Sequence, residues 1–338
     1  MQAAIVRDIG TAPEVGVMPM PSRPAGHCLV RIEAAALQPV ELFIASGRFY
    51  DGPPQLPYVP GLEGVGTVVE SDELSPGTRV RVEVVHPGYG QQGCFAEYVL
   101  IPEGATAPSR ASRSRVSPAR TDLSAELIAA AGSSGASAKL LIERAIAESG
   151  PLAGKHVVVL GATGVVGEFL VQLCRQAGVA RVVAVGRSRA RLDHASNLGA
   201  AATVRLGEDD NAATTAAILA ASEGQVDVIF DPLWGEPAAA ALDAASTGAV
   251  LINFGQSAGP RSLMSGVPLR ARGVRIIGHS GARTSAEELH RATEEILDDI
   301  AAGTVTISHE PTPLSQLPSA WQRQSESPGT KLVVIPGA

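Results

Sequence analysis

The sequence has few of the residues that cross-link a chain or hold a metal: it contains three cysteines, Cys28, Cys94 and Cys174, in 338 residues. A structural zinc site with four cysteine ligands is therefore excluded, and a disulfide framework is not expected. Lysine is also scarce, because 24 of the 27 basic residues are arginines, scattered through a chain of net charge −7. That balance disfavours a nucleic-acid surface but allows a local arginine site for a small acidic cofactor.

Long apolar runs are missing as well. No stretch approaches the roughly 18 uninterrupted apolar residues of a membrane span. Arg7 and Asp8 interrupt the N-terminal region before an apolar segment develops, so this region does not resemble a signal peptide. We therefore expect a cytoplasmic protein whose cysteines stay reduced.

The chain has enough residues for two domains of roughly 100–200 residues each. Glycine and proline contribute 36 and 24 residues, while hydrophobic residues make up 45% and charged residues 18% of the sequence. This composition is turn-rich, yet it is too apolar for a disordered chain. We expect two folded domains, each with its own core.

The first hundred residues alternate short β-rich runs with turn signals. The runs lie at 28–33, 66–70, 79–85 and 95–101, separated by Pro-Gly pairs at 60–61, 76–77 and 87–88. Their spacing predicts a compact antiparallel β-barrel or sandwich. The arginine-rich segment 103–122 lacks periodicity and is expected to be a surface loop leading into a helix near Ser124 to Ala131.

From residue 155 onward, strands and helices alternate. Strands are expected at 156–160, 181–185, 227–230, 249–253 and 274–277. This alternation predicts a parallel, doubly wound sheet. A last helix begins at a capping box of Ser285 and Glu288 and runs to about Ala302, after which strands are expected at 304–308 and 331–335. The fold class is therefore α/β, with a β-rich domain interrupted by a dinucleotide-type domain.

A phosphate-binding pattern follows the first of these parallel strands. Ala162, Gly164 and Gly167 hold the three positions of G-x-G-x-x-G, with Gly161 ahead of them. Small residues there let backbone N–H groups approach a pyrophosphate, whose charge a helix N-terminus favours. Because the pattern lies between a strand and an amphipathic helix, it favours nucleotide binding over a tight structural turn. The expected contacts are Gly161, Ala162, Thr163, Gly164, Val165, Val166 and Gly167.

The end of the second strand indicates which cofactor is bound. In NAD-selective folds an acidic residue about 20 positions after the loop usually binds the ribose 2′-hydroxyl. Here that position is Arg187, within a run that also contains Gly186, Ser188 and Arg191. Guanidinium groups and a hydroxyl suit a 2′-phosphate, so we predict NADPH. The alternative is that these arginines are surface residues, with Arg189 the first candidate for a bystander.

Two motifs point to one family. The run PGLEGVG at 60–66 and the loop at 161–167 resemble the medium-chain dehydrogenase/reductase superfamily, particularly its zinc-independent quinone oxidoreductase and enoyl reductase branch. The resemblance continues through VDVIFD at 226–231 and GTKLVV at 329–334, so it covers essentially the whole chain. It implies a GroES-like, β-barrel-type catalytic domain, a Rossmann NADPH-binding domain and a cofactor cleft between them. The expected boundaries are 1–122 and 303–338 for the catalytic domain and 123–302 for the Rossmann domain.

The resemblance also bears on metal binding. Zinc-dependent members carry a histidine before the glutamate of the PGxE motif and a cysteine in the segment that corresponds to 36–41. Here those places hold Leu62 and the cysteine-free run ALQPVE, and Cys94 lacks the companions of a structural zinc lobe. No metal is therefore expected, and Glu63 is interpreted as a structural partner of a nearby cation or N–H group.

Without a Lewis acid, the resemblance implies hydride transfer to an acceptor that is already activated, a quinone or an enone or enoyl compound. The branch usually reads Asn-Pro-Val-Asp with a tyrosine two residues later, where this chain has Gln38, Glu41 and Phe43. Gln38 is expected to contact the substrate or the nicotinamide. Tyr50 lies where enoyl reductases place a proton-donating tyrosine, although the spacing differs by about one and Phe49 competes for the position. Tyr50 is therefore either an acid for an enolate or an aromatic wall.

Further expectations concern the carboxyl edge of the sheet and its outer strand. Asn253, Phe254 and Gly255 end a strand at the edge where ligands bind in doubly wound folds, and the resemblance places them near the nicotinamide. The strand at 274–277 is expected at the sheet edge, where family members commonly pair with a second copy, so a homodimer is predicted. His86 and His279 are interpreted as structural.

The predicted function is that of an NADPH-dependent, zinc-independent oxidoreductase acting on a quinone or on an enone or enoyl compound. A second hypothesis is a non-catalytic NADPH-binding or sensory protein on the same fold, which the substituted Gln38 and Phe43 make conceivable. A serine hydrolase is a weaker idea, because the runs at 132–135 and 278–281 both miss the G-x-S-x-G spacing.

Overall fold

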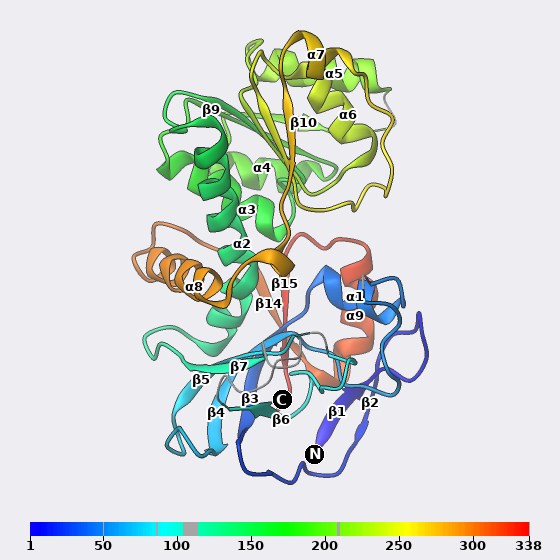
Figure 1. Cartoon of the computed structure of the whole chain (residues 1–338), viewed down its shortest axis with the longest axis vertical. Helices are drawn as coiled ribbons and strands as arrows, with labels where there is room; N and C mark the ends of the chain where they lie inside the picture. Colours follow the sequence, from blue (N-terminus) through cyan, green and yellow to red (C-terminus); the bar gives the residue numbers. More distant parts are fainter. Residues whose placement is uncertain (50, 86, 104–113, 208–209, 338) are drawn as a thin grey trace. The chain divides into compact units, whose positions relative to one another are not determined.

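The structure is a computed structural model that describes residues 1–49, 51–85, 87–103, 114–207 and 210–337 (Figure 1). It divides into two compact units, unit 1 (1–133 and 307–338) and unit 2 (134–306). The sequence-based boundary at 122/123 precedes helix α2 (Ala125–Ser149), whereas the units divide inside this helix. The helix is kinked at Gly132, which has φ 10° and ψ −128°. The turn before this kink belongs to unit 1, where Ile128 and Glu63 line the same small pocket. The second crossing falls at 306/307 rather than at 302/303.

Unit 1 is built on a mainly antiparallel sheet, as the alternating runs predict. The strand order is β14-β15-β3-β4-β5-β7, with β6 paired to β3 and only β14 and β15 parallel. Alternate residues of the strands face a core that contains Val30, Ile32, Val80 and Val82. The elements are β1 (Gln2–Ile5), β2 (Glu14–Val17), β3 (His27–Ala36), α1 (Pro39–Ala45), β4 (Glu63–Glu70), β5 (Arg79–Glu83), β6 (Tyr98–Pro102), β7 (Arg115–Pro118), β14 (His309–Pro313), α9 (Leu317–Ser325) and β15 (Lys331–Ile335).

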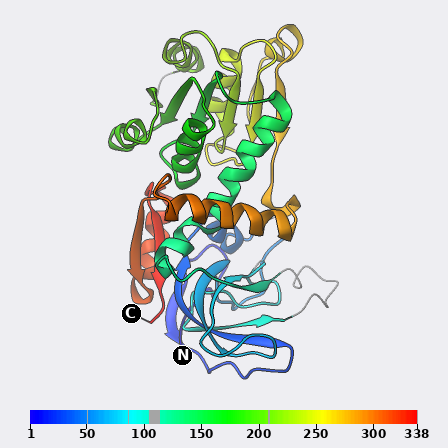
Figure 2. The same ribbon diagram turned by 90° about the vertical axis from the view of Figure 1, so that its left-hand side faces the viewer.

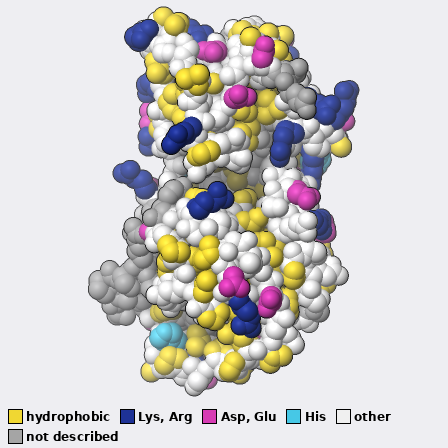
Figure 3. Space-filling model, turned by 90° about the vertical axis from the view of Figure 1, so that its right-hand side faces the viewer, with side chains coloured by type: hydrophobic (Ala, Val, Ile, Leu, Met, Phe, Trp, Pro, Cys, Tyr) yellow, Lys and Arg dark blue, Asp and Glu magenta, His cyan; other side chains and the backbone are white. Residues whose placement is uncertain are grey.

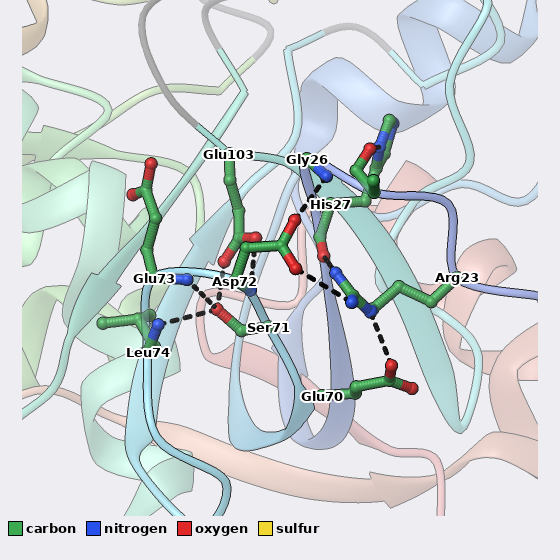
Figure 4. Close-up of polar contacts among 10 residues, drawn as sticks. Arg23, Gly26, His27, Glu70, Ser71, Asp72, Glu73, Leu74 and Glu103 are labelled. Atoms are coloured by element: carbon green, nitrogen blue, oxygen red, sulfur yellow. Dashed lines mark hydrogen bonds and ion pairs between the residues drawn. The ribbon is translucent and has the colours of Figure 1, made fainter.

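A polar network ties together the segments beside β3 and β4 (Figure 4). Arg23 donates to the carbonyl of His27 at 2.9 Å and pairs with Glu70 and Asp72, each at 2.9 Å. Asp72 also accepts the backbone N–H of Gly26 at 2.6 Å. These acidic side chains are therefore engaged in holding neighbouring turns together.

Unit 2 is the doubly wound domain that the βα alternation predicts. Six parallel strands have the order β10-β9-β8-β11-β12-β13, and helices cover both faces of the sheet (Figures 1 and 2). The capping box of Ser285 and Glu288 is confirmed and opens α8 (Ala286–Ala301). The other elements are β8 (His156–Leu160), α3 (Val165–Gln176), β9 (Arg181–Gly186), α4 (Arg189–Asn197), β10 (Ala202–Arg205), α5 (Asn211–Ala221), β11 (Val228–Asp231), α6 (Gly235–Ala244), β12 (Val250–Asn253), α7 (Val267–Ala271) and β13 (Arg275–Gly278).

The strand expected at 304–308 is wrong, because that segment is irregular and the strand lies at β14 instead. The side chain of Gln172 takes both backbone groups of Thr306, donating to its carbonyl at 2.9 Å and accepting its N–H at 2.9 Å. These bonds replace the ladder bonds of a strand. The loop expected over 103–122 is also partly wrong, since β7 lies within it and pairs with β5, while 104–113 lie outside the described residues.

On the face drawn in Figure 3, basic and acidic side chains are interspersed among polar and apolar ones. In the described part of the chain, no helix is both long and apolar enough to cross a membrane. The face drawn in Figure 3 thus gives no sign of an extended polyanion-binding surface.

Candidate functional site

The loop between β8 and α3 has the geometry that the glycine pattern predicts. Gly161 turns with φ +62°, and Gly164 is the N-cap of α3 and contributes no side chain to it. A Cβ on Gly167 would lie 2.4 Å from the carbonyl oxygen of Gly161, so only glycine permits this approach of helix to strand. The first amides of a helix lack intrahelical acceptors. The loop therefore exposes a helix N-terminus suited to an anion.

The same loop packs against the end of β9. The N–H of Ala162 donates to the carbonyl of Val185 at 3.0 Å. A Cβ on Gly186 would lie 2.5 Å from Cγ2 of Thr163, so this close contact requires glycine. The structure thus brings the predicted phosphate loop beside Gly186, the first residue of the predicted cofactor-selecting run.

Beyond Gly186, cationic groups gather at the ends of β9 and β10. Arg187 and Ser188 are exposed, and Ser188 is the N-cap of α4 without a side-chain capping bond. Arg205, at the end of β10, donates through Nε to the carbonyl of Arg187 at 3.2 Å. Among the described residues, neither Arg187 nor Arg205 has a carboxylate partner, while Arg191 forms an interaction of its own. The guanidinium group of Arg205 therefore lies beside the backbone of Arg187, next to the N-terminus of α4.

The ends of β11 and β12 form a second structured edge. Asp231 is fully buried, and its carboxylate accepts the N–H groups of Leu233 and Trp234, each at 2.9 Å. Asn253 donates to Asp231 Oδ2 at 2.9 Å and to the carbonyl of Gly255 at 2.8 Å. Burial raises the pKa of Asp231, and these hydrogen bonds counter the rise. Asp231 thus fixes the Asn253–Gly255 segment.

In unit 1, Gln38 contacts a buried carboxylate. Gln38 Nε2 donates to Glu63 Oε1 at 2.6 Å and lies 3.0 Å from Ser133 Oγ. Ser133 donates to Glu63 twice, through Oγ to Oε1 at 3.0 Å and through its backbone N–H to Oε2 at 2.9 Å. Glu63 is 8% exposed, whereas Gln38 is half-buried and accessible. The structural role expected for Glu63, bonding to N–H groups, agrees with these contacts.

Two further ionisable groups are buried in this unit. Glu41 is fully buried and accepts the N–H groups of Leu62 at 2.7 Å and Gly61 at 3.2 Å. Burial raises the pKa of Glu41 to about 8 and also raises the pKa of Glu63. Lys331 is 2% exposed, and burial lowers its pKa, while Glu63 and Glu41 act in the opposite direction. One buried ammonium thus faces two buried carboxyls.

Aromatic rings lie beside this region. Phe43 and Phe49 form an edge-to-face pair with centroids 5.9 Å apart, and Phe49 also lies 6.3 Å from Tyr89. Phe49 is buried at 8% exposure. The predicted acid, Tyr50, and His86 lie outside the described residues. For His279, burial lowers the pKa and favours the neutral ring.

Within the part of the chain that the structure describes, the positions expected to bind a catalytic zinc do not supply its ligands. Leu62 offers no ligand atom, and the carboxylate of Glu41 is occupied by two backbone N–H groups. Burial raises the pKa of Cys94 well above that of a free thiol, which disfavours the thiolate that zinc requires. Across the described ranges, no three histidine, cysteine, aspartate or glutamate side chains are grouped so as to hold a metal.

Sequence reasoning missed several residues of these regions. Arg205, Asp231, Ser133 and Lys331 were not expected to take part, although Asp231 and Lys331 lie in the quoted runs VDVIFD and GTKLVV. A signal existed for Arg205, because it ends the strand next to β9 and so must lie near its carboxyl edge. For Ser133 there was none, since its partner Glu63 is 70 residues away.

Comparisons with known proteins agree with this arrangement. Residues 24–111 match the family described as alcohol dehydrogenase GroES-like domain, and residues 165–298 match the family described as zinc-binding dehydrogenase. The tomato (Solanum lycopersicum) 2-methylene-furan-3-one reductase is 30% identical over 179 residues, covering 51% of this chain and 42% of that protein. A probable quinone oxidoreductase of Schizosaccharomyces pombe is 27% identical over 258 residues, covering 75% of this chain and 70% of that protein. The match thus spans less than half of the tomato protein.

Solved structures extend the likeness to the whole fold. The structure of a mycobacterial protein complexed with NADPH has a TM-score of 0.81 at 22% identity, covering 99% of this chain and 100% of that one. At this identity the likeness speaks for the fold. Both units therefore match one two-domain architecture, in the order in which the two families occur along the chain. The glycine loop of unit 2, the PGLEGVG run of unit 1 and these matches together place the chain in the medium-chain dehydrogenase/reductase superfamily.

Proposed function

We propose that this protein is an NADPH-dependent, zinc-independent oxidoreductase that transfers hydride to a quinone or to an activated C=C bond of an enone or enoyl compound. The observation that carries the proposal is the position of Arg187 and Arg205, joined by a side-chain to backbone bond, beside a glycine loop at the carboxyl edge of the parallel sheet. Bound NADPH would supply the hydride. The tomato and yeast relatives are named for an enone and for quinones, and the mycobacterial neighbour binds NADPH.

The proposed pyrophosphate site is the loop from Gly161 to Gly167. Its closely packed glycines allow the backbone to approach the phosphates, and the N-terminus of α3 faces the anion. At the other end of the nucleotide, Asn253, Phe254 and Gly255 would contact the nicotinamide. Asp231 holds Asn253 in place through its buried carboxylate.

The proposed 2′-phosphate site consists of Gly186, Arg187, Ser188 and Arg191, to which the structure adds Arg205. Like-charged guanidinium groups repel each other unless an anion lies between them. A 2′-phosphate would supply that anion and would accept charge-assisted hydrogen bonds from both arginines and from the free cap hydroxyl of Ser188. A 2′-hydroxyl would leave the repulsion in place.

For the acceptor, we propose contacts with the amide of Gln38 and with the aromatic rings of unit 1. The rings of Phe43, Phe49 and Tyr89 suit a flat conjugated compound. Such compounds accept hydride without a Lewis acid, which agrees with the lack of zinc ligands. We retain Tyr50 as the proposed proton donor to an enolate on its place in the sequence alone. A Tyr50→Phe variant is expected to lower kcat on an enone, and an unchanged kcat would remove this role.

The assembly proposed is a homodimer in a reducing compartment such as the cytoplasm. Strand β13 is the outer strand of the six-stranded sheet, with β12 on its inner side. A second copy would continue the sheet across a two-fold axis. Cys28, Cys94 and Cys174 are buried free thiols, as expected where disulfides do not form.

The cofactor proposal is tested by the dissociation constants of NADPH and NADH. NADPH is expected to bind more tightly, and Arg187→Ala and Arg205→Ala should each weaken NADPH by about 10- to 100-fold while leaving NADH unchanged. Arg189→Ala, at the first residue of α4 and two residues after Arg187, is the matched control and should change neither constant. Equal affinities for the two cofactors in the wild type would refute NADPH selectivity.

The reaction is tested by following NADPH oxidation with a panel of quinones and enones. Turnover of either class is expected, and the preferred class identifies the acceptor. Tight NADPH binding with no turnover of any acceptor would instead favour the non-catalytic binding protein.

A further inference from the structure

The side chain of Gln38 does not do what its position at the start of a helix suggests. Gln38 is the N-cap residue of α1, yet its side chain makes no capping hydrogen bond. The amide turns instead to Glu63 on β4 and to Ser133 at the kink of α2. Its backbone is held by its neighbours, since Leu37 donates to the carbonyl of Leu332 and Pro39 opens the helix.

These contacts determine which way round the amide lies. The NH₂ nitrogen of Gln38 lies 2.6 Å from Glu63 Oε1, and the backbone N–H of Ser133 points at Oε2, so both oxygens of this carboxyl act as acceptors. Its second hydrogen points to Ser133 Oγ at 3.0 Å. Ser133 Oγ lies 3.0 Å from Glu63 Oε1 and 3.2 Å from Gln38 Oε1. We assign its hydroxyl hydrogen to the closer acceptor, Glu63 Oε1. Both N–H bonds of Gln38 are therefore used.

The carboxylate that imposes this orientation is itself held firmly. The backbone N–H of Ser133 donates to Glu63 Oε2 at 2.9 Å. A Cβ on Gly132 would lie 2.5 Å from the same oxygen, so the kink of α2 fits closely around the carboxylate. Burial raises the pKa of Glu63, and Lys331, which is buried in the same unit, counters part of that rise.

We propose that Glu63 and Ser133 are positioning residues that fix Gln38 with its NH₂ group engaged, so that its carbonyl oxygen Oε1, 3.2 Å from Ser133 Oγ, recognises a ligand by accepting a hydrogen bond. The ligand group must then carry an N–H or O–H donor. This inference rests on the proposed function, in which two ligands offer such a donor: the carboxamide of the nicotinamide and the hydroxyl of a reduced quinone. A carbonyl oxygen that gains negative charge would be repelled by Oε1, so oxyanion stabilisation falls to other groups.

The test compares ligands with and without the donor. The first pair is NADPH and its reduced 3-acetylpyridine analogue, whose acetyl group has no N–H. The second pair is hydroquinone and its dimethyl ether, measured as inhibitors. We expect the wild type to favour the donor-bearing member of one pair by about tenfold, the size of one hydrogen bond. The pair that is discriminated identifies the ligand group that Gln38 contacts.

Variants then assign the discrimination to this arrangement. Gln38→Met removes the carbonyl and should bring the ratio to about one. Glu63→Gln lets either end of the Gln38 amide face residue 63 and should lower the ratio towards one. Ser133→Ala retains the backbone N–H that bonds Glu63, so it should lower the ratio less than Glu63→Gln does. It replaces Glu63→Gln in the test if that variant does not fold. Thr67→Val is the control, because Thr67 lies on the same strand and bonds a different carboxylate, Glu33.

Three results would overturn the inference: a wild-type ratio near one for both pairs, a ratio that Gln38→Met does not change, or a ratio that neither Glu63→Gln nor Ser133→Ala changes. Failure of the proposed function is separate, since it appears as absent NADPH binding or turnover in the wild type before any variant is made.

Discussion

At the scale of single residues, Gly132 is a position where the structure leaves no room for a side chain. A Cβ there would lie 2.5 Å from Glu63 Oε2 and 2.9 Å from its Cδ, inside a carboxylate that three donors hold in place. We expect Gly132→Ala to lower the free energy of unfolding by about 1–3 kcal/mol, as overpacking does. Urea titration measures this loss. Gly281→Ala is the control, since a Cβ at Gly281 meets nothing within 4 Å.

A pH dependence follows from Glu41. Burial raises its pKa from 4.5 to about 8, so between these values the folded chain binds more protons at this carboxyl than the unfolded chain does. The contribution of Glu41 to stability is therefore full below 4.5 and is lost as the pH rises through about 8, by at most about 1.4 kcal/mol per pH unit.

The variant Glu41→Gln removes this proton and its pH dependence. Its unfolding free energy, measured in urea at pH 5, 6.5 and 8, should fall less steeply than that of the wild type. Because a glutamine accepts only one of the two N–H groups that Glu41 binds, the variant should be less stable at pH 5. Parallel profiles for the two proteins would contradict the raised pKa.

At the scale of elements, two glycines of the loop between β8 and α3 should differ in what their substitution changes. One affects both packing and cofactor binding, and the other affects cofactor binding alone. A Cβ on Gly167 would lie 2.4 Å from Gly161 O, whereas one on Gly164 would meet the same oxygen at 3.4 Å. Gly167→Ala should therefore reduce both stability and NADPH affinity, the latter at least tenfold, because α3 can no longer approach β8. Gly164→Ala should leave stability unchanged and weaken NADPH alone. Thermal unfolding and NADPH titration of both variants check this, and equal stability losses would contradict it.

Elements defined by neighbours in sequence were predictable. The apolar run at 156–160, the glycine loop after it and the capping box of Ser285 are all confirmed as structural elements, because their signals span only a few residues. The segment 304–308 was not predictable, because Gln172, 134 residues away from Thr306, takes its backbone bonds. The candidate site divides in the same way. The loop residues follow from a local pattern, while the bonds of Glu63 to Ser133 depend on tertiary packing.

At the scale of the whole molecule, the outer strand β13 leads to a prediction about assembly. If two copies pair along it, sedimentation should give twice the chain mass of 34.7 kDa. Ile277→Lys places a charge on this partly exposed edge and should shift the protein towards monomer. Val17→Lys, at a 77% exposed position on β2, is the control and should leave the mass unchanged. A wild-type monomer would rule out the proposed dimer.

The interrupted arrangement of unit 1 has a consequence for biosynthesis. Strand β15 completes the unit by pairing with β3, and it brings Lys331 to the two buried carboxyls, Glu41 and Glu63. The ribosome releases this strand about 200 residues after Ser133. Unit 2 is continuous in sequence and is complete before β15 is synthesised. At that stage the nascent chain contains a finished unit 2 and a unit 1 that still lacks Lys331, the cation beside its two buried carboxyls. Until Lys331 emerges, protons are the cations that let those carboxyls enter the core.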